Sequence, residues 1–214
     1  MDKLTFFLVI ISAIFCVTWG AESQITKAMK KFKIIPEIVS ADIDQTLKVT
    51  FDSGASVNKG NEISPFEARN QPALDWDAND NACYTILCMD VDAPAPDDRS
   101  ISNIVTWMVG NILGKDVDSG EVLVEYIPVS PPRGSQLHRS IYLVFEHPKK
   151  IKFDRKPIDA STITGRPYFS LDDFSEKYGF GGPVAGNFYL TQFDDHVLKV
   201  YKRLSCCFEL NKPE

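Results

Sequence analysis

Residues 131–139 contain the side chains best suited to bind a small charged molecule. A Pro-Pro turn that ends in Pro132, followed by Gly134, places the His138–Arg139 pair at the start of an apolar stretch. The backbone N–H groups of such a loop, an imidazole and a guanidinium all attract anions. The segment therefore suggests an anion site, although a loop of this composition before a strand is also a common tight connection.

A second polar segment follows the apolar residues 84–89. Asp90 and Asp92 occupy alternate positions there, and alternate residues of a strand face the same side of a sheet. Two close carboxylates are typical of a general acid and base, of a metal site, or of a turn in which they accept backbone N–H groups; the turn is the commonest of these. If the two segments meet, a carboxylate beside His138 would favour the imidazolium form, which attracts an anion.

The elements around these segments point to a β-rich chain. Apolar runs of strand length recur, and the amphipathic stretches of helical period lie mainly toward the ends of the chain. That order favours a single domain with a β-sandwich and peripheral α-helices over alternating β-α units. A capping box at Ser64–Glu67 opens one additional helical turn. We expect strands within residues 47–51, 84–89, 104–112, 122–126, 141–145 and 187–193, and helices within residues 22–33, 171–178 and 194–204.

Both polar segments resemble the signature regions of the phosphatidylethanolamine-binding protein family, which have the approximate forms DPDAP and GPPxGxxxHRY. Residues 88–94 and 131–139 match these regions, and further matches in the right order extend the resemblance over residues 32–204. The resemblance implies two antiparallel sheets with peripheral helices, and a pocket for an anion such as a phospholipid headgroup. The further matching segments are 64–72, 107–112 and 174–195. The positions that the resemblance places at the pocket are Asp90, Asp92, Thr106, Pro132, His138, Ser140 and Tyr201.

The chain departs from the family pattern at several of these positions. Thr106 stands where many members have a second pocket histidine, and Ser140 stands where they have the tyrosine of the His-Arg-Tyr motif. Gln136 replaces a common glycine, and Val91 replaces the proline of DPDAP. Exchange of a charged contact for a neutral one costs roughly 1–2 kcal/mol. We therefore expect an affinity for a phosphate headgroup about ten-fold or more below that of standard members, unless the pocket has changed its ligand.

Several other side chains have structural explanations. Arg139 should face the side of its strand opposite His138, where an ion pair is its expected role. His147 and His196 are expected at the surface. Tyr201 equally suits packing of its helix, and His138 itself would suit a partly buried position in which one hydrogen bond satisfies the ring.

The first 20 residues have the layout of a secretory signal peptide. A basic residue precedes the apolar residues 4–17, and the small residues Thr18 and Gly20 suit the two recognised positions before a cleavage site. A membrane anchor would need about 20 apolar residues, and this stretch is shorter. We therefore expect residues 1–20 to be removed and residues 21–214 to form one secreted domain.

Composition limits the partners of this domain. The formal net charge of −6 argues against non-specific binding of nucleic acid, and no second apolar run is long enough to span a membrane. Cys83 and Cys88 lie too far apart on one expected strand to form a disulfide, and a bridge between Cys206 and Cys207 would be strained. No His or Cys spacing suits zinc, and no metal or other cofactor is implied.

Three functions remain open. The leading hypothesis is a secreted, non-enzymatic protein that binds a small anionic or amphipathic ligand, since secreted insect members of the family that this chain resembles have been viewed as antennal ligand carriers. An extracellular serine-protease inhibitor or a modulator of a signalling pathway is the alternative that the resemblance implies. A hydrolase is a remote third possibility. Asp90, His138 and Ser140 have the residue types of a catalytic triad, but no Gly-x-Ser-x-Gly elbow or evident oxyanion hole accompanies them.

Overall fold

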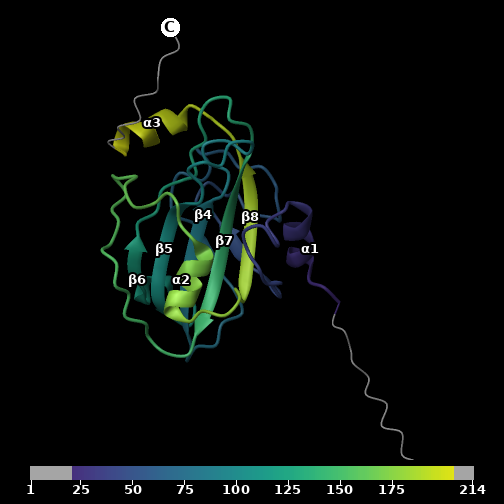
Figure 1. The fold of residues 1–214 in the computed structure, drawn as a ribbon, viewed down its shortest axis with the longest axis vertical. Helices are drawn as coiled ribbons and strands as arrows, with labels where there is room; N and C mark the ends of the chain where they lie inside the picture. Colours follow the sequence, from purple (N-terminus) through teal and green to yellow (C-terminus); the bar gives the residue numbers. More distant parts are fainter. Residues whose placement is uncertain (1–20, 205–214) are drawn as a thin grey trace, which may run out of the picture.

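A six-stranded sheet runs through the centre of the molecule in the computed structural model, which describes residues 21–204 (Figure 1). Its strands are β1 (Gln45–Thr46), β4 (Cys83–Asp90), β5 (Ile104–Leu113), β6 (Glu121–Val124), β7 (His138–His147) and β8 (Ala185–Thr191). They lie in the order β1-β8-β7-β4-β5-β6. A second, antiparallel sheet contains β2 (Lys48–Thr50) and β3 (Ala73–Asp75).

Strands β4 and β7 form the middle of the large sheet because both are largely apolar. All eight residues of β4 are buried, as expected for a strand that is covered on both faces. β4 pairs antiparallel with β7, with Cys83 opposite His147 at one end and Asp90 opposite Ser140 at the other. The polar residues that end β4 and begin β7 therefore lie side by side at the same end of the sheet.

Strand β1 makes the large sheet mixed, since Gln45 and Thr46 pair in parallel with Ala185 and Gly186 of β8. The prediction of a mainly β chain with peripheral helices is confirmed. The prediction of two antiparallel sheets is met only in part, because this edge pairing is parallel and the second sheet has just two strands. A strand of two residues is too short to show a periodic pattern in the sequence.

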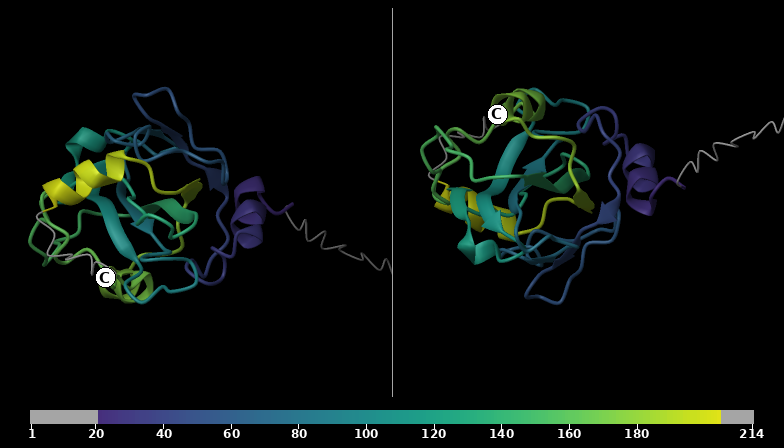
Figure 2. Two further views of the ribbon diagram at one scale, coloured as in Figure 1. Left: turned by 90° about the horizontal axis from the view of Figure 1, so that it is seen from above. Right: turned by 90° about the horizontal axis from the view of Figure 1, so that it is seen from below.

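Helices cover the sheet from outside, as the views in Figures 1 and 2 show. Helix α2 (Leu171–Tyr178) illustrates why the helices begin and end where they do. The Ser170 hydroxyl accepts the backbone N–H of Asp173 at the start of this helix, and Gly179 ends it in the left-handed conformation with φ of 71°. This helix has the range predicted from the sequence, residues 171–178. The helices are α1 (Gln24–Lys31), α2 (Leu171–Tyr178) and α3 (His196–Arg203), with a 3-10 turn at Val117–Ser119.

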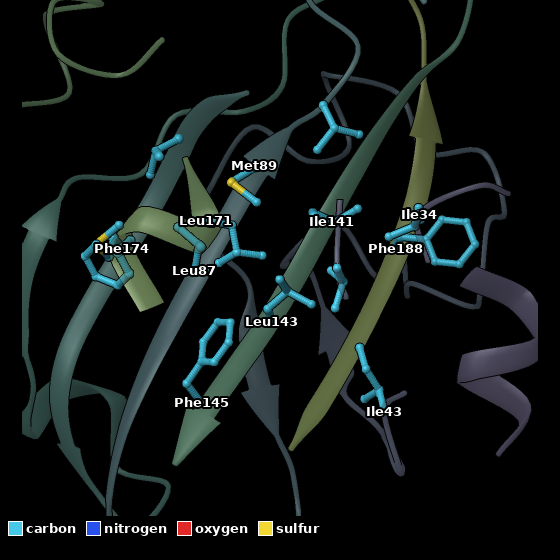
Figure 3. Close-up of a cluster of buried hydrophobic side chains, with 14 of the residues drawn as sticks. Ile34, Ile43, Leu87, Met89, Ile141, Leu143, Phe145, Leu171, Phe174 and Phe188 are labelled. Carbon is cyan, nitrogen blue, oxygen red and sulfur yellow. The ribbon is translucent and has the colours of Figure 1, made fainter. Parts of the chain in front are cut away.

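Apolar side chains pack on both faces of the large sheet. On one face Leu87 of β4 and Leu143 of β7 lie in a cluster with Phe174 of α2 (Figure 3). On the other face Ile86 of β4 packs in a cluster with Val49 of β2. The sheet is therefore fixed on both sides and can hold the side chains at its end in defined positions.

Most predicted strands form, with shifted ends. β7 begins at His138, earlier than the predicted 141–145, and β8 covers Ala185–Thr191 instead of 187–193. Cys83 and Cys88 are buried and free, whereas the predicted signal peptide and the pair Cys206–Cys207 lie outside the described residues. Within residues 21–204, no helix is long and apolar enough to cross a membrane.

Candidate functional site

A cavity with a volume of about 100 Å³ lies at the end of the large sheet, next to α3. β4 contributes Asp90 to its wall, β7 contributes His138 and α3 contributes Tyr201. These side chains meet because α3 crosses the end of the sheet where β4 ends and β7 begins (Figure 1). The aliphatic part of the lining comprises Ile101, Ile104, Ile127, Val129, Ile163 and Leu204.

His138 is held between a carboxylate and a hydroxyl. Its side chain is fully buried, and Nδ1 lies 2.9 Å from Asp90 Oδ2 and 3.1 Å from Asp90 Oδ1. The other ring nitrogen, Nε2, lies 3.0 Å from Ser135 Oγ. Asp90 also accepts the backbone N–H of Asp92 at 3.0 Å. The imidazole is therefore fixed in orientation at the cavity wall by contacts at both nitrogens.

Ser135, and not the Ser140 considered for a catalytic triad, is the serine whose hydroxyl contacts the His138 ring. Ser140 is fully buried within β7, opposite Asp90 on β4 and Tyr189 on β8. It is not part of the cavity lining. The imidazole turns toward the loop that precedes β7, and strand spacing alone does not reveal this direction. A role of Ser140 in ligand binding stays a prediction.

Asp92 is engaged in an ion pair and does not line the cavity. Its carboxylate accepts hydrogen bonds from Arg139 through the backbone N–H at 2.9 Å, Nε at 2.8 Å and Nη2 at 2.6 Å. Burial disfavours the charge on Arg139, but the hydrogen bonds and the charge of Asp92 raise the pKa of this guanidinium above its ordinary value. The ion-pair role predicted for Arg139 is confirmed. Since β4 ends at Asp90, Asp92 no longer follows the alternation of a strand, and its part in ligand binding stays a prediction.

The other predicted positions contribute to the cavity through different elements. Thr106 is a buried residue of β5, and Pro132 lies in the loop before β7, where its carbonyl accepts the Ser135 hydroxyl at 2.9 Å. The Tyr201 hydroxyl donates to the Ser130 carbonyl at 2.9 Å, which attaches α3 to the same loop. The predicted positions that surround the cavity are thus Asp90, Thr106, Pro132, His138 and Tyr201.

The sequence prediction missed the aliphatic lining and a buried cation. Ile101 and Ile163 come from loops that are remote in sequence and reach the cavity only in the folded chain. The Arg166 side chain is also fully buried, and its Nη1 lies 3.4 Å from the carbonyl oxygen of Thr106. No local pattern in the sequence indicates these contacts.

The prediction that His147 lies at the surface is also wrong. Only 3% of its surface is exposed, with Nε2 at 3.2 Å from Thr85 Oγ1 and Nδ1 at 2.7 Å from the Lys149 carbonyl oxygen. The reason is that β7 extends through His147, whose ring packs against Phe180 with centroids 5.6 Å apart. His196 is partly buried against Phe66, with ring centroids 5.9 Å apart, and burial lowers the pKa of its imidazole.

Comparisons with known proteins agree with this fold. The family model of phosphatidylethanolamine-binding proteins matches residues 48–189. The chain is 31% identical to odorant-binding protein A5 of Drosophila melanogaster over 183 residues, which cover 86% of this chain and 87% of that protein. It is 30% identical to the 26 kDa secreted antigen of Toxocara canis over 162 residues, which cover 74% of this chain and 61% of the antigen.

Two solved structures are similar to this chain in fold. The solution structure of CG7054 is 34% identical, has a TM-score of 0.66, and covers 80% of this chain and 97% of its own. A carboxypeptidase Y inhibitor, crystallised with its cognate proteinase, also has a TM-score of 0.66 and covers 79% of this chain and 95% of its own. Its sequence identity of 21% makes this a likeness of fold.

Proposed function

The chain belongs to the phosphatidylethanolamine-binding protein family, and we propose that it is a secreted, non-enzymatic protein that binds a small amphipathic anion in the cavity next to α3. The observation that supports this proposal most strongly is the make-up of the cavity wall. His138 and Asp90 supply a charged and hydrogen-bonding area, while most of the remaining wall is aliphatic. Such a mixture suits a ligand with a polar head and an apolar chain.

The apolar wall distinguishes this ligand from a free inorganic anion. Each methylene group that leaves water for an apolar wall contributes about 0.8 kcal/mol. Burial of two such groups would strengthen binding about ten-fold. A phosphate that carries an alkyl chain should therefore bind more tightly than inorganic phosphate.

Two observations support an extracellular site of action. The sequence predicts a signal peptide over residues 1–20, and relatives of the chain bear the names odorant-binding protein and secreted antigen. The proposed mature chain begins at Ala21. N-terminal sequencing of the exported protein tests this, and recovery of the mature pool with Met1 still attached would contradict it.

The contacts of Ser135 favour binding over catalysis. Ser135, His138 and Asp90 form a connected chain, but Ser135 does not line the cavity and its hydroxyl donates to the Pro132 carbonyl. A fluorophosphonate probe should therefore leave Ser135 unmodified, as judged by mass spectrometry of the tryptic peptide. Stoichiometric modification of Ser135 would instead revive the hydrolase hypothesis. The protease-inhibitor alternative draws on the carboxypeptidase Y inhibitor, and since that likeness is one of fold, we do not prefer it.

Titration calorimetry on residues 21–214 tests the proposed function. Hexyl phosphate should bind about ten-fold more tightly than inorganic phosphate. Ile104→Trp, which fills the cavity from one end of β5, should abolish binding of hexyl phosphate. Leu113→Trp is the matched control, because Leu113 lies at the other end of the same strand with 51% of its surface exposed. Failure of the unmodified protein to bind hexyl phosphate, or equal losses in both variants, would refute the proposal.

A further inference from the structure

Arg166 is a fully buried cation that is held by main-chain oxygens. None of its surface is exposed, and its guanidinium donates hydrogen bonds to carbonyl groups over distances of 2.8–3.4 Å. These carbonyls come from three separate stretches of the chain, so the side chain joins β5, the residues after β6 and its own loop. The acceptors are the carbonyl oxygens of Val105, Thr106, Glu125, Asp159 and Thr162.

No carboxylate of the described residues lies within 4.0 Å of the Arg166 guanidinium. The side chains of Glu125 and Asp159 bind other groups, the backbone N–H of Ala160 and of Ser161 respectively. Burial lowers the pKa of Arg166 to about 10, so the guanidinium is still positively charged at neutral pH. Its charge is therefore solvated by main-chain dipoles, and the carboxylates of Glu125 and Asp159 offset it in part from beyond ion-pair distance.

This charge lies directly behind the cavity wall. Arg166 Nη1 is 3.4 Å from the carbonyl oxygen of Thr106, and Thr106 is one of the residues that line the cavity. The backbone N–H of Arg166 donates to the carbonyl of Ile163 at 3.1 Å, and Ile163 is another lining residue. Two contacts thus connect Arg166 to two parts of the wall.

The charges around the cavity are compatible with an anionic ligand. Arg139 neutralises Asp92, and among the lining residues Asp90 supplies the carboxylate, which pairs with His138. An anionic ligand that faced Asp90 without a further cation would be repelled. The positive charge that the chain lacks in the side chain of Thr106 is supplied by the layer behind it.

We propose that Arg166 determines the preference of the cavity for negatively charged ligands, through its field and without touching the ligand. This inference rests on the proposed function. Two unit charges roughly 10 Å apart at an effective dielectric constant of about 20 attract each other enough to change affinity by about ten-fold. Because the guanidinium is buried, this preference should resist salt much better than one caused by surface charges.

The test compares hexyl phosphate with uncharged hexan-1-ol, which shares the alkyl chain. The readout is the ratio of the two affinities measured by calorimetry on residues 21–214. Arg166→Met should lower this ratio about ten-fold, and Arg166→Lys, which retains the charge, should keep most of it. Lys202→Met removes an exposed cation from α3 and should leave the ratio within about two-fold. A purely structural role of Arg166 would weaken both ligands together and leave the ratio unchanged.

A second variant keeps the test decisive if Arg166→Met does not fold, since that change leaves several carbonyls without donors. Asp159 is exposed, and its carboxylate opposes the field of Arg166. Asp159→Asn should therefore raise the affinity for hexyl phosphate by about two-fold at low salt, with hexan-1-ol unaffected. If the ratio of the two affinities is unchanged in Arg166→Met, the inference about Arg166 is wrong, while the proposed function still stands. The same conclusion follows from an unchanged ratio in Asp159→Asn if Arg166→Met does not fold. Absence of hexyl phosphate binding by the unmodified protein overturns the proposed function as well.

Discussion

Replacement of Asp92 by alanine should destabilise the protein strongly while leaving the cavity almost unchanged. Asp92 is buried, with 2% of its side chain exposed, and accepts three hydrogen bonds from Arg139. Hydrogen bonds to charged groups contribute roughly 1.5–3 kcal/mol each. Arg139 retains its bonds to the carbonyls of Phe32 and Lys33, so the full sum is not lost. We expect Asp92→Ala to cost about 3–5 kcal/mol, the range for breaking one side of a buried ion pair.

The assay is denaturant unfolding of the wild type, of Asp92→Ala, and of Asp92→Ala combined with Arg139→Met. The double variant should lose less stability than the sum of the two single variants, because each single change leaves one buried charge without its partner. Asp75→Ala is the matched control: its ion pair with Lys115 has a separation of 3.0 Å, but 54% and 59% of the two side chains are exposed. That control should lose less than about 1 kcal/mol.

Measurement of ligand binding distinguishes a structural role of Asp92 from a role in the ligand site. Where Asp92→Ala remains folded, its affinity for hexyl phosphate should stay within about two-fold of the wild type. A stability loss no larger than that of Asp75→Ala would refute the structural role assigned to Asp92. A selective loss of hexyl phosphate binding, with stability unchanged, would instead place Asp92 in the ligand site.

Three further predictions follow from single positions. Thr106→His should tighten binding of hexyl phosphate by about ten-fold at pH 6, and by less at pH 8, because protonated imidazole attracts the anion; equal affinity at both pH values would contradict this. Gln136 has φ of 69°, so Gln136→Gly should raise the free energy of unfolding by about 0.5–1 kcal/mol. A lower midpoint of thermal unfolding in this variant would count against backbone strain at Gln136. The backbone N–H of Ser64 lowers the pKa of Glu67 below its ordinary value of 4.5. The stabilisation by Glu67 is therefore present above pH 4.5 and is lost as the pH falls through the lowered pKa. The difference in free energy of unfolding between the wild type and Glu67→Gln should accordingly shrink on acidification. A difference that does not depend on pH would contradict this prediction.

Local sequence signals predicted the elements that depend on local interactions. α2 has its capping serine and terminal glycine in the sequence, and β4 is a mostly apolar run, so both were predicted within a few residues. β1 depends on its pairing with β8, which no local pattern encodes. The same distinction explains why the mixed character of the large sheet was not foreseen.

The residues of the site were predicted or missed for the same reason. Asp90 and His138 stand at strand ends that the sequence brings together, and they do meet. The partner of Asp92 and the direction of the His138 ring depend on how the chain turns after each strand, which spacing cannot indicate. Arg166 was missed because its partners are main-chain oxygens of residues far apart in sequence, and such acceptors carry no signature of residue type.

A crystal structure of residues 21–214 with hexyl phosphate tests the central claim most directly. We predict density for the ligand in the cavity next to α3, with the phosphate against His138 and Thr106 and the alkyl chain against Ile104 and Leu204. The phosphate should lie on the side of the cavity backed by Arg166. Density at another surface, or a ligand in the cavity with its phosphate directed away from His138 and Thr106, would contradict the account.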